Sequence, residues 1–168
     1  ADAVMLSAET AAGRHPIEAV QFMSRIVIEA ESHILKHPES GPGQLPVENT
    51  VYHAVARTSV SLAETVEAKV MVAFSSSGNT ALRIARERPL IPFFVMTPNL
   101  KGQRRLGLLW GTRTAASAFS EDFESAITEA IDEIKRRNIA GRGQQIVVVA
   151  GMPFGIEGTT NSMRVVTL

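Results

Sequence analysis

The order of hydrophobic and polar residues along the chain predicts alternating strands and helices. Apolar runs of strand length occupy residues 70–74, 91–96 and 145–150. The last of these is almost pure valine, which is typical of a strand covered on both faces. Periodic apolar residues, or caps followed by helix-forming residues, predict helices between and before these runs. These predicted helices are residues 49–66 (capped by Asn49 or Thr50), 81–87, 99–106 and 120–137 (capped by Ser120).

The end of the chain predicts two further strands of the sheet. A third strand with a bend is predicted over residues 107–112 and 114–118, and a last strand over residues 162–168. The last strand follows residues 145–150 without an intervening helix, so this pair is expected to be antiparallel. The expected fold class is therefore α/β, with a mostly parallel five-stranded sheet, flanking helices and a final antiparallel strand.

The first part of the chain reads as a separate block. Residues 3–6 predict a short buried strand, residues 7–15 a polar loop, and Pro16 the first position of a long amphipathic helix. Residues 37–46 contain three prolines and two glycines, which is typical of a linker. The expected organisation is a β-α unit over residues 1–36, this linker, and a domain over residues 47–168. Since the chain starts inside a strand pattern without an initiator methionine, we expect a piece of a longer polypeptide.

A hydroxyl-rich stretch follows the strand at 70–74. It consists of Ser75, Ser76, Ser77, Gly78, Asn79 and Thr80. Where a strand turns into a helix, the free N–H groups and the helix dipole favour an anion. Hydroxyl groups add donors, and a glycine lets the backbone approach a ligand. Serine, asparagine and threonine are also ordinary helix caps, so capping is the alternative, but three serines and a threonine exceed what one cap needs.

Composition limits the possible partners. Lysine plus arginine equal aspartate plus glutamate at 17 each, so no nucleic-acid partner is expected. The absence of cysteine excludes disulfides and cysteine-bound metals and fits the cytosol, while the four histidines lack metal-ligand spacing. No apolar run approaches the ~20 residues of a membrane helix, so no membrane partner is expected.

Two smaller groups of residues are interpreted as structural. A basic group is expected on the solvated face of a short helix: Lys101, Arg104 and Arg105. An apolar group is expected in the core: Leu106, Leu108 and Trp110.

Several spaced motifs together resemble the pyruvate kinase family. Residues 2–13 read Asp-Ala-Val-Met-Leu-Ser-Ala-Glu-Thr-Ala-Ala-Gly and look like the last strand and loop of the family's barrel. The later motifs follow in the family's order and cover essentially the whole chain. They are Ser-Ser-Ser-Gly-Asn-Thr-Ala at 75–81, Arg-Pro at 88–89, Leu-x-Leu-x-Trp-Gly at 106–111, Val-Val-Val-Ala-Gly at 147–151 and Gly-Thr-Thr-Asn at 158–161.

The resemblance implies a role for each part. Residues 1–36 would be the eighth β-α unit of a barrel, and residues 47–168 the C-terminal regulatory domain of a cytoplasmic, homotetrameric glycolytic enzyme. That enzyme transfers a phosphoryl group from phosphoenolpyruvate to ADP with Mg²⁺ and K⁺. The family's catalytic lysine, metal-binding stretch and nucleotide-binding arginines have no equivalent here, so no catalytic residue, metal or cofactor is expected in this fragment. Ser7, Glu9 and Thr10 would stand at the barrel rim, where barrel active sites lie, although Glu9 is equally compatible with a structural role.

The resemblance also implies a sugar-phosphate effector, often fructose 1,6-bisphosphate. Its phosphate would contact the hydroxyl-rich stretch, and a loop at 153–160 with Gly155, Gly158 and Thr159 would close over it. The sequence departs from bisphosphate-responsive members, which tend to have a basic residue where Ser76 stands. Glu157 would also repel a second phosphate. A monophosphate, another anion or no effector is therefore expected.

Two other classes remain open. The Ser-x-Ser-Gly-x-Thr pattern also resembles sugar-phosphate isomerase domains, which do not share the motif at residues 2–13. A purely structural reading makes the domain an oligomerisation module. In that case the serines are caps, and the last strand and the helix from Asn49 form subunit contacts.

Overall fold

The computed structural model of the chain describes residues 2–37, 46, 48–117, 122–154, 156 and 158–168. The chain forms two compact units, residues 3–47 and residues 48–168.

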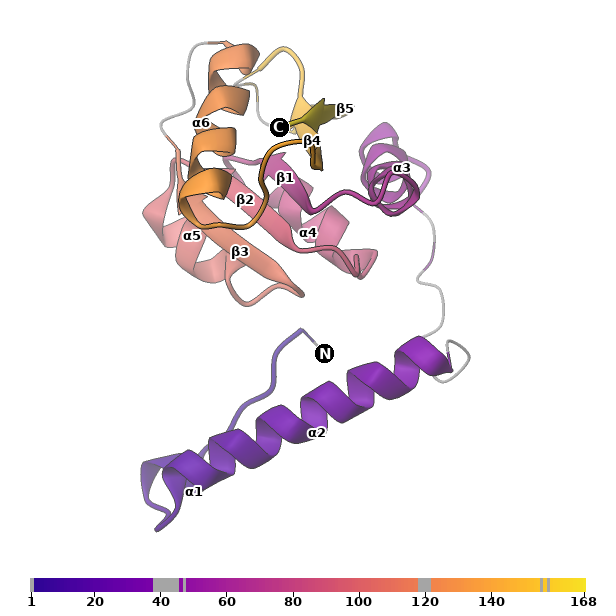
Figure 1. The fold of residues 1–168 in the computed structure, drawn as a ribbon. Helices are drawn as coiled ribbons and strands as arrows, with labels where there is room; N and C mark the ends of the chain where they lie inside the picture. The colour runs from indigo at the N-terminus through magenta and orange to yellow at the C-terminus, as the bar shows by residue number, and fades with distance from the viewer. Residues whose placement is uncertain (1, 38–45, 47, 118–121, 155, 157) are drawn as a thin grey trace. The chain divides into compact units, whose positions relative to one another are not determined.

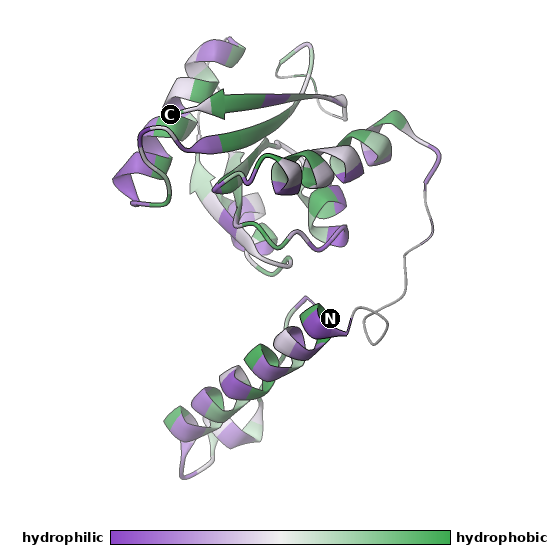
Figure 2. Cartoon of the chain, turned by 45° about the vertical axis from the view of Figure 1, so that its right-hand side comes forward, coloured by the Kyte–Doolittle hydropathy of each residue, from purple (hydrophilic) through white to green (hydrophobic). Residues whose placement is uncertain are grey.

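The smaller unit is dominated by one long helix. It contains a single turn, α1 (Ala8–Ala11), followed by α2 (Pro16–Lys36), which has Pro16 at its first position as predicted. None of the residues of α2 is buried, and apolar and polar bands alternate along it (Figure 2). Residues 3–6 are not a strand, and residues 8–11 are helical where a loop was predicted. A strand needs a neighbouring strand to satisfy its backbone groups, and the described part of this unit supplies none.

The larger unit is built on a five-stranded sheet in the order β3-β2-β1-β4-β5 (Figure 1). Its strands are β1 (Val70–Phe74), β2 (Phe93–Thr97), β3 (Thr112–Ala116), β4 (Gln145–Gly151) and β5 (Thr160–Thr167). The four strands β3, β2, β1 and β4 pair in parallel, whereas β5 pairs with β4 in the antiparallel sense. The predicted fold class is confirmed.

Helices cover both faces of this sheet. They are α3 (Val51–Thr65), α4 (Asn79–Arg86), α5 (Leu100–Leu106) and α6 (Phe123–Arg136). Because side chains alternate along a strand, Val72 and Phe74 of β1 pack in the core beneath α6. Met71 and Ala73 pack in the opposite core, beneath α3 and α4 (Figure 1). All five residues of β1 are buried, as expected for a strand between two helical layers.

The helix starts follow the chemistry of their caps. Thr50 Oγ1 accepts the N–H of His53 at 3.2 Å, which confirms one of the two predicted caps of α3. Asn99 caps α5 by accepting from two backbone N–H groups. The predicted cap Ser120 lies outside the described residues. Asp122 is the N-cap of α6, and its Oδ1 accepts the N–H of Ser125 at 2.8 Å.

The segment before β3 differs from its prediction. Residues 107–111 form turns, and β3 begins only at Thr112. Leu106 is buried as predicted, but Leu108 is 65% exposed because the turn directs it to solvent. Trp110 is half-buried, and its Nε1–H donates to the carbonyl of Pro89 at 3.3 Å.

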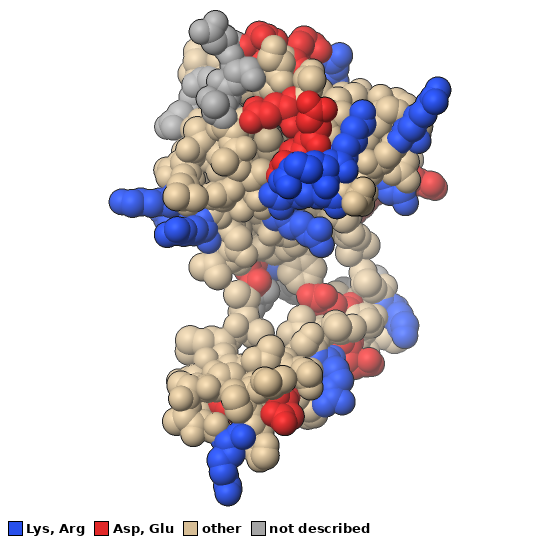
Figure 3. Space-filling view, turned by 60° about the vertical axis from the view of Figure 1, so that its left-hand side comes forward, with Lys and Arg blue, Asp and Glu red and all other residues tan. Residues whose placement is uncertain are grey.

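Charged side chains lie on the surface of the larger unit. The basic residues predicted on a solvated face of α5 are all exposed: Lys101, Arg104 and Arg105. Figure 3 shows acidic and basic side chains next to one another on the face it presents. On α6, Glu133 pairs with both Arg136 and Arg137 at 2.7 Å. The hydrogen bond from Arg136 is the main cause that lowers the pKa of Glu133.

The cap of α6 makes stability depend on pH. The Ser125 hydroxyl, and then its N–H, hold the pKa of the Asp122 carboxyl below its usual value. A carboxyl of this kind stabilises the fold above its unfolded pKa of ~3.9, and that contribution is lost as pH falls through the folded pKa. Asp122→Asn keeps an acceptor but does not titrate. We therefore expect the unaltered chain to lose more stability than D122N between about pH 7 and about pH 3, measured by urea unfolding. Equal losses would contradict the role of this cap.

Candidate functional site

The carboxyl edge of the sheet has a point where the strand order reverses. The chain passes from β1 through α4 to β2 on one side, but from β3 through α6 to β4 on the other side of β1. In open α/β sheets, ligands bind in the crevice outside such a switch point. The Ser75–Thr80 loop follows β1, and the segment from 151 to 160 joins β4 to β5, so both predicted halves of the site meet there.

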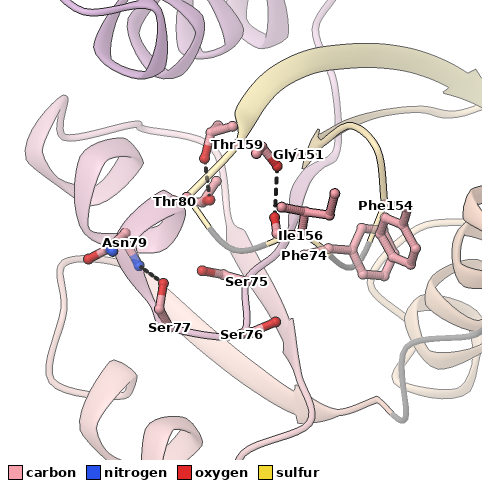
Figure 4. Close-up of a pocket in the computed structure, with 12 residues that line it drawn as sticks. Phe74, Ser75, Ser76, Ser77, Asn79, Thr80, Gly151, Phe154, Ile156 and Thr159 are labelled. Atoms are coloured by element: carbon pink, nitrogen blue, oxygen red, sulfur yellow. Dashed lines mark hydrogen bonds between the residues drawn. The ribbon is translucent and has the colours of Figure 1, made fainter.

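A small pocket of about 30 Å³ lies between these two segments (Figure 4). Its lining combines hydroxyl-bearing residues with a few apolar ones. The lining residues are Phe74, Ser75, Ser76, Ser77, Asn79, Thr80, Gly151, Phe154, Ile156, Gly158, Thr159 and Thr160. Of the predicted site residues, Gly78 is not part of the lining, and Gly155 lies outside the described residues, as does Glu157.

Two of the three serines accept hydrogen bonds within the turn that leads into α4, whose N-cap residue is Gly78. The N–H of Gly78 donates to Ser75 Oγ at 3.0 Å, and the N–H of Asn79 donates to Ser77 Oγ at 3.5 Å. Ser76 is half-buried, and its hydroxyl makes no hydrogen bond with any residue that the structure describes. The turn therefore engages Ser75 and Ser77, and Ser76 keeps a free donor in the pocket wall.

The two segments are joined by a buried pair of hydroxyl groups. Thr80 Oγ1 and Thr160 Oγ1 lie 2.5 Å apart, and both residues are almost fully buried. Thr80 is in the first turn of α4, and Thr160 is the first residue of β5. The Thr80 hydroxyl is thus engaged with the opposite segment, which leaves Ser76 as the stronger candidate for contact with a ligand.

Two glycines stand at positions where a side chain would be strained or would clash. Gly78 has a φ of 89°, a left-handed conformation that favours glycine, and an added Cβ would lie 3.0 Å from the Leu106 side chain. At Gly151 an added Cβ would lie 2.3 Å from Thr159 Oγ1 and 2.9 Å from the Thr159 carbonyl carbon. No side chain fits at Gly151 without moving the backbone of the facing segment.

An apolar wall closes one side of the pocket. The Phe154 ring packs edge-on against Phe74 at 5.4 Å between centroids and tilted against Phe123 at 5.5 Å. The Thr159 hydroxyl donates to the carbonyl of Ile156 at 2.7 Å, which fixes the turn beside this wall. The sequence did not single out Phe74, Phe154 or Ile156 as site residues, although Phe154 and Ile156 fall within the predicted closing loop at 153–160. The available signal was that Phe74 directly precedes Ser75 at the end of the strand.

The pocket carries little charge of its own. Among the lining residues that the structure describes, none has an ionisable acidic or basic side chain. An anion bound here would be held by hydroxyl and N–H donors and by the positive end of α4.

The three residues predicted at the barrel rim form a local network in the smaller unit. The Ser7 N–H donates to Glu9 Oε2 at 2.9 Å, and the Thr10 hydroxyl donates to the Ser7 carbonyl at 3.1 Å. The N–H groups of Glu9 itself and of Ser7 lower the pKa of the Glu9 carboxyl. Glu9 thus acts as a structural partner of this turn.

The described residues form neither a metal-binding group nor a membrane-spanning helix. No group of three histidine or acidic side chains lies close enough to hold a metal ion among the residues with described positions. Within that same set, none of the helices has the length and apolar character to cross a membrane.

The larger unit matches a known domain family. The model of the family described as "Pyruvate kinase, alpha/beta domain" matches residues 53–166, which include the pocket and the sheet up to the penultimate residue of β5. The chain belongs to the pyruvate kinase family.

Individual relatives extend the match to the smaller unit. Two proteins named pyruvate kinase from Agrobacterium vitis are 41% and 39% identical to the chain over 165 and 168 residues. A pyruvate kinase from Methylorubrum extorquens is 35% identical over 165 residues. These alignments cover 98%, 100% and 98% of this chain but only 35%, 35% and 34% of the relatives. The chain thus spans about a third of the length of the curated relatives it matches.

Proposed function

We propose that the α/β domain binds a small phosphate-bearing molecule or another compact anion at the pocket of the Ser75–Thr80 loop. The observation that carries this proposal is the pocket at the switch point of the sheet. Ser76, with its uncommitted hydroxyl, lines this pocket together with Asn79 and Thr80 from the first turn of α4. Donors and the helix dipole together favour a negative charge at this position.

The expected ligand has one anionic group. The pocket measures about 30 Å³, and its described lining offers no positive side chain to balance a second phosphate. Calorimetry with phosphate, a hexose monophosphate and fructose 1,6-bisphosphate tests the proposal. Binding of the monophosphates, with the bisphosphate no tighter, is the expected result. Absence of binding by all three would refute it, and much tighter bisphosphate binding would refute the restriction to one anionic group.

The parent polypeptide is proposed to be a pyruvate kinase of the cytoplasm, with residues 1–36 as the last β-α unit of its barrel and residues 37–46 as a linker. The names of the relatives and the coverage of the alignments support this assignment. The Mg²⁺ and K⁺ of the whole enzyme would bind elsewhere in the polypeptide, since the described residues here offer no metal-binding group. Limited proteolysis of the chain should cut within residues 41–44. Cutting inside the sheet instead would refute the two-part organisation.

The isolated chain should not catalyse phosphoryl transfer. The reaction depends on positioned charges and metal ions around the moving phosphoryl group, and this third of the enzyme supplies no such set among its described residues. In a lactate dehydrogenase-coupled assay with phosphoenolpyruvate, ADP, Mg²⁺ and K⁺, turnover should equal that of the protein-free control. A metal-dependent rate from the pure chain would contradict the assignment.

A second candidate function is self-association through β5. This strand forms an edge of the sheet that the structure describes, it packs on α3, and Met163 and Val165 are 39% and 37% exposed. An open edge of this kind pairs readily with a second copy. Sedimentation should show association of the unaltered chain, its loss in a Met163→Lys/Val165→Lys variant, and no change in the matched surface variant Leu108→Lys. Association that persists in the double variant would place the interface elsewhere.

A further inference from the structure

A side-chain amide fastens the start of the pocket's second wall. Asn161 Nδ2–H donates to the carbonyl of Met152 at 2.7 Å, and the N–H of Met152 donates to Asn161 Oδ1 at 2.8 Å. One side chain therefore satisfies both backbone groups of Met152. Residues 152 and 161 bracket the segment that carries Phe154, Ile156 and Thr159, three residues of the pocket wall.

The position of Asn161 in the sheet explains why a side chain does this. The ladder between β4 and β5 is irregular here, because Ala150 pairs with Ser162 but Gly151 pairs with Thr160. Asn161 is thus the extra residue of a β-bulge, a feature that disrupts the ladder and redirects a side chain. Its amide continues the hydrogen bonding by one residue beyond the last backbone pair.

We propose that Asn161 is a positioning residue of the anion site and acts through the backbone of Met152. This inference rests on the anion binding proposed above. Asn161 is not among the residues that line the pocket, so it has no direct part in ligand contact. The two hydrogen bonds between Asn161 and Met152, called the clamp below, fix the start of the 152–161 segment. The Thr80–Thr160 hydroxyl pair and the packing of Phe154 fix it further along. Without the clamp, the segment must be ordered when the ligand binds, and that ordering weakens affinity.

The variant Asn161→Asp provides a test in which the anion affinity of one protein is compared at two pH values. A protonated carboxyl has the shape of the amide, so its O–H donates to the Met152 carbonyl and its other oxygen accepts the Met152 N–H. An ionised carboxylate faces that carbonyl with no proton to donate, so the clamp opens as pH rises through the carboxyl pKa, which starts from ~3.9 in an isolated residue. Sulfate is the probe because its double charge is constant over this range, whereas phosphate titrates.

Calorimetry with sulfate at about pH 7 and about pH 4 measures the effect on both sides of this transition. N161A should bind about tenfold more weakly than the unaltered chain at both pH values, as expected for two lost hydrogen bonds. N161D should bind as weakly as N161A at the higher pH and recover about half of the difference at the lower pH, where about half of its carboxyls are protonated. The exposed control variant Asn49→Asp should follow the unaltered chain at both.

The possible outcomes separate this inference from the proposed function. No sulfate or phosphate binding by the unaltered chain would refute the proposed function and this inference with it. Binding by the unaltered chain that N161A leaves unchanged would refute only the role of Asn161. Weak binding by N161D at both pH values would also refute it, because the loss would then come from general damage. If N161A fails to fold, the uncharged variant Asn161→Ser takes its place, because its short side chain cannot reach both backbone groups of Met152 and its loss of affinity cannot come from charge repulsion.

Discussion

The Ser76→Asp chain should bind phosphate or sulfate at least about 100-fold more weakly than the unaltered chain. Ser76 lines the pocket with an uncommitted hydroxyl, and no positive side chain of the described lining would offset a new negative charge there. Two like charges ~4 Å apart repel by roughly 4 kcal/mol at the effective dielectric of a protein surface. Since every ~1.4 kcal/mol is a factor of ten in affinity, 100-fold is a cautious figure. Calorimetry with both anions measures it.

Matched variants at the same position separate charge from size. Ser76→Asn introduces a side chain of nearly the same size as aspartate but without its charge. Ser76→Ala removes only the hydroxyl. We expect Ser76→Ala to weaken binding by about 1–3 kcal/mol, the usual range for a hydrogen bond to a charged group. An equal loss in the Asn and Asp variants would show that the effect is steric. Unchanged affinity in the Asp variant would reduce the loop to a helix cap.

The Gly151→Ala chain should lose about 1–3 kcal/mol of unfolding free energy, the usual cost of overpacking a well-packed site. The added Cβ would lie 2.3 Å from Thr159 Oγ1 and 2.9 and 3.0 Å from the carbonyl carbon and oxygen of Thr159. The last two are backbone atoms, which cannot rotate away as a flexible side chain does. The facing segment must therefore shift, and anion binding should weaken together with stability. Urea unfolding and calorimetry measure the two effects.

The chain contains a matched glycine for this experiment. An added Cβ at Gly141 would meet no atom within 4 Å, so Gly141→Ala should leave both stability and anion binding unchanged. In the double variant Gly151→Ala/Thr159→Ala, only the clash with the hydroxyl is removed, so partial recovery is expected. Full stability in Gly151→Ala alone would show that the two segments separate without cost, which contradicts a preformed second wall.

The sequence by itself determined the class of the fold and the first half of the site. Burial of one face of a helix, or of both faces of a strand, leaves a local pattern of apolar residues. That pattern can be read directly from the sequence. The serine loop was identified for the same reason, since the donors of a strand-to-helix turn come from consecutive residues. The motifs at residues 2–13 and 75–81 carried the resemblance to pyruvate kinase that the family match and the alignments with relatives confirm.

The predictions were wrong where the secondary structure or burial of a residue depends on contacts beyond its sequence neighbours. Residues 3–6 have the composition of a strand, but a strand forms only beside another strand, and composition does not supply one. Leu108 has the side chain of a core residue, yet the turn at 107–111 leaves it exposed. The cap of α6 was assigned two residues too early because Ser120 and Asp122 are both good caps.

Only the tertiary structure decided the second half of the site. The hydroxyls of Thr80 and Thr160 meet across a separation of 80 residues, and the order β3-β2-β1-β4-β5 is what brings their segments together. The aromatic packing of Phe154 on Phe74 is likewise a consequence of that order, whereas the bonds of Asn161 to Met152 depend on the pairing of β4 with β5. Local sequence encodes the period and chemistry of each element, whereas contacts between distant elements are set by how strands pair in the sheet.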